Sequence, residues 1–190
     1  MAAVPEINPK SILKIDSNID VQKHFLTSYM SQLWLIQEFL QSMINRNSGH
    51  FVTISSILAC TDLPLMAVYS SMKAAQAKLM ESVREELRVN KIDKVYTTVV
   101  YPGAMQEGRA STSIDTLFEI SNFMKLSNIE EIANTIATGV LRNEATLFVP
   151  RYQRLMFSLK NLLSPRILGL FIDNIVKVKE EGLHLKPKVY

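Results

Sequence analysis

Residues 94–102, KVYTTVVYP, constrain the fold of this 190-residue chain more than any other stretch. Five of them are β-branched and two are tyrosines, which is typical of a buried strand, and a Pro-Gly pair ends the run. Shorter runs of the same kind occur at 51–55 (FVTIS) and 145–150 (ATLFVP). Segments with a helical spacing of apolar residues alternate with these runs. This alternation predicts an α/β fold with a parallel sheet.

Two long helices and one shorter helix are expected around these strands. Apolar side chains recur every three or four residues in 18–46, at Val21, Phe25, Tyr29, Leu33, Ile36, Leu40 and Met43. A second stripe, apolar except for Gln76, follows in 69–89, at Met72, Gln76, Leu79, Val83 and Leu87. Residues 127–143 open with a Ser or Asn cap and acidic residues, which indicates a helix start. The weakly periodic segment 103–127 is expected to be long and mobile.

Three parallel strands make a narrow sheet for this class of fold. A parallel sheet buried on both faces normally has more strands. We therefore expect a partial Rossmann-type, doubly wound α/β fold, the second half of a larger sheet. Residues 1–190 form a single truncated domain in this interpretation, with an apolar helical segment and tail at 151–190.

Composition excludes several classes of function. The net charge is only +3, and no basic cluster is interleaved with aromatic residues, so nucleic-acid binding is not expected. Cys60 is the single cysteine, which excludes an internal disulfide framework. His24, His50 and His184 have no metal-ligand spacing and are interpreted as surface or boundary residues. No metal site is expected.

No signal peptide or membrane span is expected from the sequence. The amino terminus lacks a basic segment followed by a long apolar run, and no stretch reaches the roughly 18 to 20 apolar residues of a spanning helix. Residues 151–179 are apolar but interrupted by Lys160, Pro165, Arg166 and Asp173. This segment fits either a lip around a lipid-like substrate or a membrane-interface helix, or else amphipathic helices that cover the sheet edge.

The stretch AVYSSMKAA sets Tyr69 four residues before Lys73, on one face of a predicted helix. An ammonium near a phenol favours the phenolate and lowers its pKa from about 10, so the pair suits proton exchange. Chance matches to this spacing are common, however, and Lys73 alone could be a solvated helix lysine. Ser56 stands thirteen residues before Tyr69, at a strand end.

These residues together resemble the catalytic half of the short-chain dehydrogenase/reductase family. The resemblance runs from about Lys10 to the C-terminus and includes GHFVTISS, a proline, YSSMK, and a strand that ends in YPG. The most similar branch contains the 17-beta-hydroxysteroid and retinol dehydrogenases, some of which associate with membranes and lipid droplets. The Ser56–Tyr69–Lys73 spacing followed by Pro-Gly discriminates far better than the Tyr-Lys pair alone.

The resemblance implies a reaction. Tyr69 would exchange a proton with the hydroxyl or carbonyl of a hydrophobic alcohol or ketone, such as a steroid, retinoid or fatty alcohol. Ser56 would hydrogen-bond the same oxygen, and Lys73 would hold the ribose hydroxyls of NAD or NADP.

It also implies the surroundings of the reaction. Pro102, Gly103 and Met105 would lie against the nicotinamide; the alternative for the Pro-Gly pair is a plain strand-ending turn. The family's usual interface predicts a homodimer through helices 18–46 and 69–89. The expected location is the endoplasmic reticulum membrane or the lipid droplet surface, and otherwise the cytoplasm.

The sequence departs from the family pattern at several points. Its six glycines include no TGxxxGxG turn for the cofactor pyrophosphate, and MAAV resembles the end of the family's fourth strand, so the first half of the fold is expected to be missing. Ser28 stands where the family carries an asparagine, and Glu107 where it carries a threonine. Two hypotheses follow: a nicotinamide-dependent oxidoreductase, or a non-catalytic truncated member that pairs with a partner through its long helices.

Overall fold

The structure is a computed structural model, and it describes residues 9–61, 63–104, 118–120, 128–160 and 162–179. Strands β1 (Gly49–Ile54), β2 (Val95–Pro102) and β4 (Thr146–Val149) form a parallel sheet in the order β1-β2-β4. The register pairs Ile54 with Val100 and Tyr101 with Phe148. The predicted strands and the α/β class are therefore confirmed.

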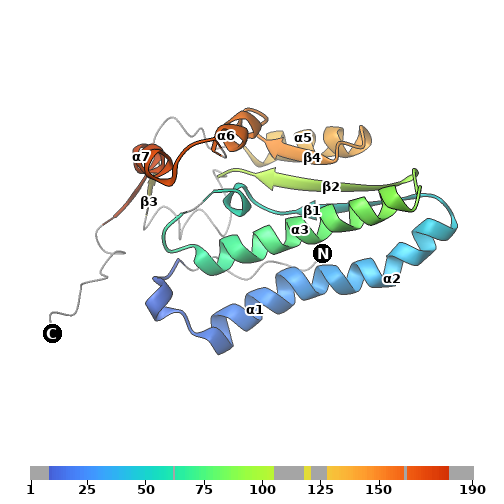
Figure 1. The fold of residues 1–190 in the computed structure, drawn as a ribbon, viewed down its shortest axis with the longest axis horizontal. Coiled ribbons are helices and arrows are strands. Elements are labelled where there is room, and N and C mark those ends of the chain that lie inside the picture. Colours follow the sequence, from blue (N-terminus) through green and yellow to red (C-terminus); the bar gives the residue numbers. More distant parts are fainter. Residues whose placement is uncertain (1–8, 62, 105–117, 121–127, 161, 180–190) are drawn as a thin grey trace.

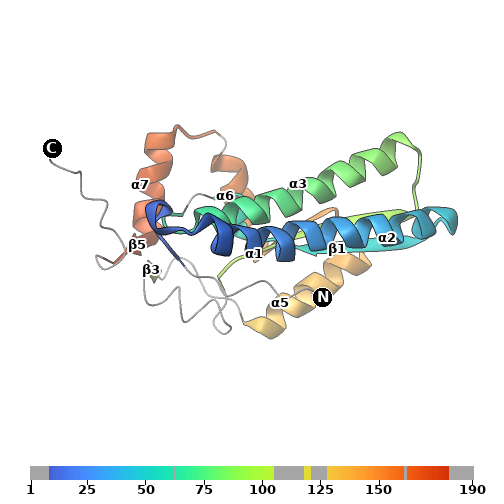
Figure 2. The same cartoon turned by 90° about the horizontal axis from the view of Figure 1, so that it is seen from below.

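Helices cover both faces of this sheet. Helices α2 (Ser31–Asn45) and α3 (Ala67–Val89) lie on one face, and α5 (Ile129–Leu141) lies on the other (Figures 1 and 2). Alternate residues of β2 divide between two apolar clusters, because successive strand side chains point to opposite faces. Val99 belongs to the cluster under α2 and α3, whereas Val100 packs with Ile132 of α5. The sheet is thus a central layer between helices.

The predicted helix 18–46 is a continuous helical rod, which we call the α1–α2 rod (residues 17–45). It contains the π-helical segments η2 (Ser17–Val21) and η3 (Phe25–Met30), which flank α1 (Gln22–His24) and precede α2. A π turn uses one extra residue, so the buried stripe is displaced by one position in the first half of the rod.

This displacement corrects two parts of the sequence-based prediction. His24 and Ser28 are buried where Phe25 and Tyr29 were expected, and Phe25 is 41% exposed. His24 is therefore not a surface residue, which makes that interpretation wrong. The Ser28 carbonyl accepts a hydrogen bond from Gln76 Nε2 of α3 at 2.7 Å, and this bond ties η3 to α3.

The C-terminal part contains the two expected apolar helices, α6 (Gln153–Lys160) and α7 (Pro165–Ile175). It also contains an element that the sequence did not predict, because β5 (Val176–Val178) pairs antiparallel with β3 (Phe118–Ile120). Residues 118–120 were assigned to a long mobile segment, and that assignment is wrong for them, since three residues are too few to show an alternating pattern. Within the described ranges, no helix has the length and apolar character needed to cross a bilayer.

Candidate active site

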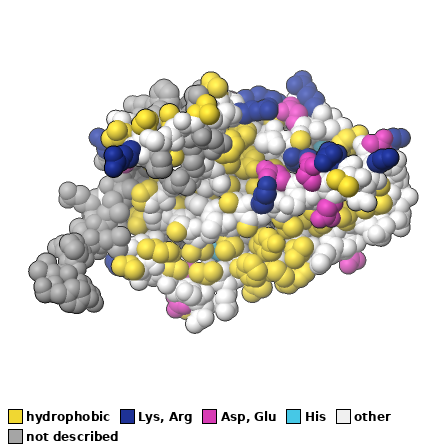
Figure 3. Space-filling model, in the orientation of Figure 1, with side chains coloured by type: hydrophobic (Ala, Val, Ile, Leu, Met, Phe, Trp, Pro, Cys, Tyr) yellow, Lys and Arg dark blue, Asp and Glu magenta, His cyan; other side chains and the backbone are white. Residues whose placement is uncertain are grey.

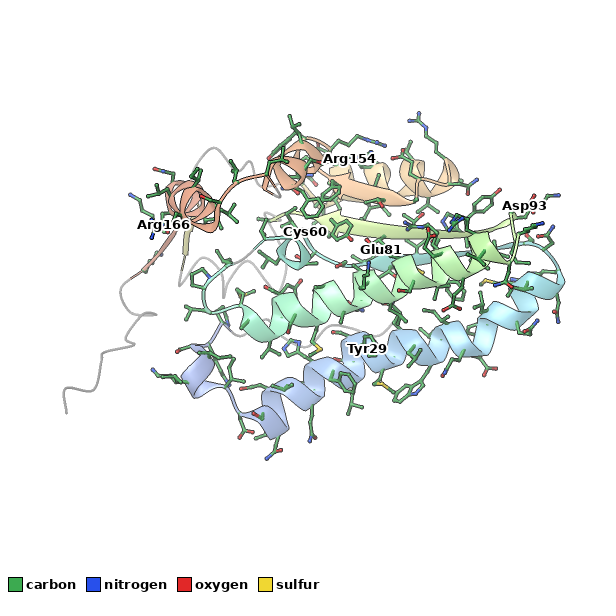
Figure 4. The ribbon with its side chains drawn as sticks, in the orientation of Figure 1. Tyr29, Cys60, Glu81, Asp93, Arg154 and Arg166 are labelled. Atoms are coloured by element: carbon green, nitrogen blue, oxygen red, sulfur yellow. The ribbon has the colours of Figure 1, made fainter. Side chains whose placement is uncertain are left out.

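The C-terminal ends of the three parallel strands bring the candidate residues to one edge of the sheet. Ser55 and Ser56 follow β1, Gly103 follows β2, and Gln153 follows β4 by four residues. Figure 4 shows Cys60, in the connection after β1, beside this end of β2, and Tyr29 on the rod alongside α3. Ligands of open α/β sheets bind outside the carboxyl ends of the strands, so this edge is the expected place for a site.

Ser56 is held at the strand end by the turn that follows it. Its hydroxyl accepts a hydrogen bond from the Leu58 N–H at 3.2 Å and caps the short 3₁₀ helix η4 (Ile57–Ala59). The chain returns through Pro64 and starts α3 at Ala67, which puts Tyr69 in the first turn of that helix. The Ser56 side chain lies close enough to the Tyr69 phenol to favour its ionised form. The thirteen-residue spacing therefore places the two side chains near each other.

Lys73 is one turn further along α3 and is only 3% exposed. Its Nζ donates to the Ile54 carbonyl at 2.8 Å, and its own carbonyl accepts from Ser55 Oγ at 2.8 Å. Nζ lies 5.9 Å from the centroid of the Tyr69 ring, so the two side chains share one helix face as their spacing predicts. The alternative of a solvated helix lysine is wrong.

The electrostatics of the pair differ from the expectation. Burial lowers the pKa of Lys73 to about 8, because the charged amine loses water. Burial also raises the pKa of Tyr69, and the nearby Ser56 side chain opposes this rise without cancelling it. The net shift is therefore opposite to the lowering that the sequence suggested. The phenol of Tyr69 is protonated at neutral pH.

The Pro102–Gly103 turn has a packing role that the sequence did not reveal. The Gly103 N–H donates to the Val149 carbonyl at 2.8 Å. A Cβ at Gly103 would lie 2.3 Å from Nε2 of Gln153, which is itself 4% exposed. The buried amide of Gln153 thus fills the space beside this glycine. Met105 and Glu107, the other residues assigned to this region, lie outside the described residues.

His24 is a neighbour of the site that the sequence did not predict. Its ring meets the Tyr69 ring edge-on, with centroids 6.5 Å apart and an interplanar angle of 83°. Apolar periodicity missed this histidine because the π segment moves the buried stripe by one residue. The available signal was its position four residues before Ser28, which is one turn of the same rod.

Two hollows lie near the described helices. A largely apolar groove of about 620 Å³ runs between the β1–α3 connection, α3 and α7, and it is lined by residues that include Leu58, Leu63, Ala67, Ser70 and Ile172. A polar hollow of about 600 Å³ runs along α5, on the other face of the sheet. The first is lined by Leu58 and Ala59 of the connection that follows Ser56. Among the described side chains, no three His, Cys, Asp or Glu residues gather as a metal site requires.

Comparison with known proteins gives matches to one family. Residues 2–116 match the family model described as short chain dehydrogenase. Human estradiol 17-beta-dehydrogenase 11 is 26% identical over 153 residues, which cover 79% of this chain and 48% of that protein. Rat 17-beta-hydroxysteroid dehydrogenase 13 is 25% identical over 164 residues, 86% of this chain and 52% of that protein. The chain spans about half the length of the curated relatives it matches.

Solved structures share the fold. A short chain dehydrogenase from Burkholderia cenocepacia in complex with NADP superposes with a TM-score of 0.65 at 18% identity, over 86% of this chain and 65% of that chain. A short-chain dehydrogenase from Sphingobium yanoikuyae in complex with NADPH gives 0.64 at 16% identity, over 83% and 61%. The smaller share of each solved chain agrees with a partial α/β fold.

Burial of Lys73 predicts an unusual pH dependence of stability. The unfolded chain binds this proton up to about pH 10.5, whereas the folded chain releases it at about pH 8, so stability rises with pH across this window. Between pH 7.5 and 9.5 the free energy of unfolding should increase by about 2 kcal/mol in urea titrations. Lys73→Met should abolish the increase, and Lys78→Met, at an exposed position of the same helix, should retain it. An equal increase in all three proteins would contradict the assignment.

Proposed function

The chain belongs to the short-chain dehydrogenase family, and on that premise we propose that it carries the acid–base half of a nicotinamide-dependent oxidoreductase acting on the CH–OH group of a hydrophobic alcohol or its ketone. The observation that carries the proposal is the joint placement of Ser56, Tyr69 and Lys73 at the carboxyl edge of the sheet. Relatives named as steroid dehydrogenases, and structural neighbours solved with NADP or NADPH, support it.

The three side chains would have distinct roles. In the reducing direction, the protonated phenol of Tyr69 would donate its proton to the carbonyl oxygen, and its raised pKa keeps that proton available at neutral pH. Ser56 would donate a hydrogen bond to the same oxygen. In the oxidising direction Tyr69 must act as a base, which requires the Lys73 charge to favour the phenolate.

The described residues fit the nicotinamide end of a cofactor. Lys73 has three N–H donors, and the hydrogen bond to the Ile54 carbonyl uses one of them, which leaves donors for ribose hydroxyls. NAD or NADP would supply or accept the hydride when bound. The pyrophosphate end has no glycine-rich turn in this sequence, so we expect this chain alone to bind the cofactor weakly.

The groove of about 620 Å³ supports a hydrophobic substrate. It is lined by Leu58, two residues after Ser56, and by Ser70, next to Tyr69. An apolar body could lie in this groove between α3 and α7, beside the connection that follows Ser56. Steroids, retinoids and fatty alcohols share this combination of one reactive oxygen and a large apolar body.

Tyr69→Phe tests the proposal. Removal of the phenol hydroxyl should lower turnover of a hydrophobic ketone with NADPH or NADH by at least about 100-fold, while the cofactor affinity stays nearly unchanged. Tyr96→Phe, at the opposite end of β2, is the matched control and should keep both the turnover and the cofactor affinity.

Fluorescence titration with up to millimolar cofactor is the first measurement. Failure to bind either cofactor would contradict catalysis by this chain alone and favour the non-catalytic alternative.

We also propose that the chain pairs with a second copy through the α1–α2 rod and α3, under either hypothesis. Figure 3 shows hydrophobic surface, in yellow, over these helices. Five large apolar side chains of the rod are 41–52% exposed: Phe25, Leu26, Trp34, Leu35 and Phe39. Contiguous exposed apolar surface of this kind marks interaction sites.

Light scattering after size exclusion tests this pairing. The wild-type chain should have twice the monomer mass, and Trp34→Asp with Phe39→Asp should make it monomeric. Leu141→Asp, at an 84% exposed position on α5, should leave the mass unchanged. A monomeric wild type at about 10 µM would exclude a dimer of micromolar or better affinity.

A lipid surface is a further proposed partner and would agree with a location on the endoplasmic reticulum or on lipid droplets. Leu155 of α6 and Ile167 and Leu170 of α7 are 53–67% exposed, and Arg154 and Arg166 lie beside them (Figure 4). Such a pattern suits helices that lie in a membrane interface.

A flotation assay with phospholipid vesicles tests this partner. The wild-type protein should float with the vesicles, and the double variant Leu155→Ser with Leu170→Ser should reduce the floating fraction. Equal flotation of both proteins would contradict the proposal.

A further inference from the structure

His24 is a buried polar side chain whose placement neither the family pattern nor the proposed mechanism explains. It is 9% exposed, and its Nδ1 has no hydrogen-bond partner among the described residues. Buried polar atoms are normally paired, because an unpaired one loses its bonds to water without replacement. A histidine retained in such a place therefore needs an explanation.

The surroundings of His24 connect it to the candidate active site. Its ring meets the Tyr69 ring edge-on, and Lys73 is close enough to disfavour the protonated imidazole. Two bonds between the rod and α3 fix this arrangement: Gln76 Nε2 donates to the Ser28 carbonyl at 2.7 Å, and Gln32 Nε2 donates to the Gln76 carbonyl at 3.1 Å. His24 thus lies one helical turn before Ser28, where these hydrogen bonds join the rod to α3.

Four titratable groups face His24. Asp20 and Lys23 lie on its own rod, and Tyr69 and Lys73 lie on α3. Asp20 is also paired with Lys10, whose Nζ is 2.7 Å from Oδ2. Burial lowers the pKa of His24 most, Lys23 and Lys73 lower it further, and Asp20 opposes them. The ring is therefore neutral at pH 7.

We propose that His24 is a positioning residue of this acid–base site: its neutral imidazole packs edge-on against the Tyr69 ring, and its protonation disfavours the charged form of Lys73. The physical reason is the proximity of two cations. A protonated imidazole beside the buried ammonium costs Coulomb energy that water cannot screen, so the two protons compete. The expected effect on activity rests on the proposed function. The coupling between the protons of His24 and Lys73 does not rest on it.

The consequence is an acid limit on the site. As the pH falls below the ordinary value of 6.5 for histidine, the unfolded chain takes up the His24 proton before the folded chain does, so native stability decreases. Where the folded chain is protonated at His24, the charged form of Lys73 becomes less favourable. Activity that depends on Tyr69 and Lys73 should therefore decrease at acid pH, as His24 takes up its proton.

Histidine NMR titration of the full chain tests the coupling without cofactor or turnover. The His24 resonance is assigned by its loss in His24→Asn, and His50 serves as an internal control, because burial alone lowers its pKa. His24 should titrate below 6.5. Lys73→Met should raise its midpoint, Asp20→Asn should lower it, and neither should move His50.

Lys23→Gln is a second variant, at an exposed position outside the site, so it leaves the buried site intact. It should also raise the titration midpoint of His24. Lys73→Gln replaces Lys73→Met if the latter does not fold. A His24 that titrates at the ordinary value, or that ignores the loss of Lys73, would overturn the inference.

Kinetics separate this inference from the proposed function. The acid limb of the pH–rate profile should move with the His24 midpoint in Asp20→Asn. The acid limb should be lost in His24→Phe, which keeps a ring without nitrogen. Turnover at pH 7 should be present in His24→Asn. A limb that stays in place in Asp20→Asn and His24→Phe would overturn the positioning role. Absence of turnover in the wild type would contradict the proposed function, and the NMR result would then decide on the coupling alone.

Discussion

The buried ammonium of Lys73 is the constraint on which the rest of the site depends. A charged amine that is 3% exposed is unfavourable unless it is hydrogen-bonded, and here it donates to the carbonyl of the last residue of β1. Ser55, the next residue, donates back to the carbonyl of Lys73. This reciprocal pair of bonds fixes α3 over the end of the strand, and it thereby sets Tyr69 above Ser56. A shift of the helix along the sheet would leave the ammonium without its partner.

Much of this arrangement could be predicted from the sequence. The strands were evident as β-rich runs, two of which ended at a proline, and the alternation with helices indicated their parallel order. The face shared by Tyr69 and Lys73 followed from a spacing of four residues. The direction of the Tyr69 pKa shift could not be predicted, because the spacing shows a nearby charge but not how deeply the helix is buried. In this case burial is the largest cause and raises the pKa of Tyr69.

Other features depend on three-dimensional contacts that leave little trace in the sequence. The π segment η3 displaces the buried stripe of the rod, so His24 was assigned to the surface although it lies against Tyr69. Gly103 was interpreted through a cofactor, whereas the structure shows the Gln153 amide in the space beside it. The pairing of β3 with β5 joins segments more than fifty residues apart, which no local pattern reports. In each case the missing information is the identity of a distant partner.

A direct titration of the lysine side chains tests the central claim that Lys73 is a buried, hydrogen-bonded ammonium beside Tyr69. Carbon-13 NMR of the lysine Cε atoms, with Lys73→Met for assignment, reports each ammonium separately. The structure predicts one lysine that titrates at a pKa of about 8 and is absent from the variant. If every lysine titrates near the ordinary value of about 10.4, Lys73 is solvated and this account of the site is wrong.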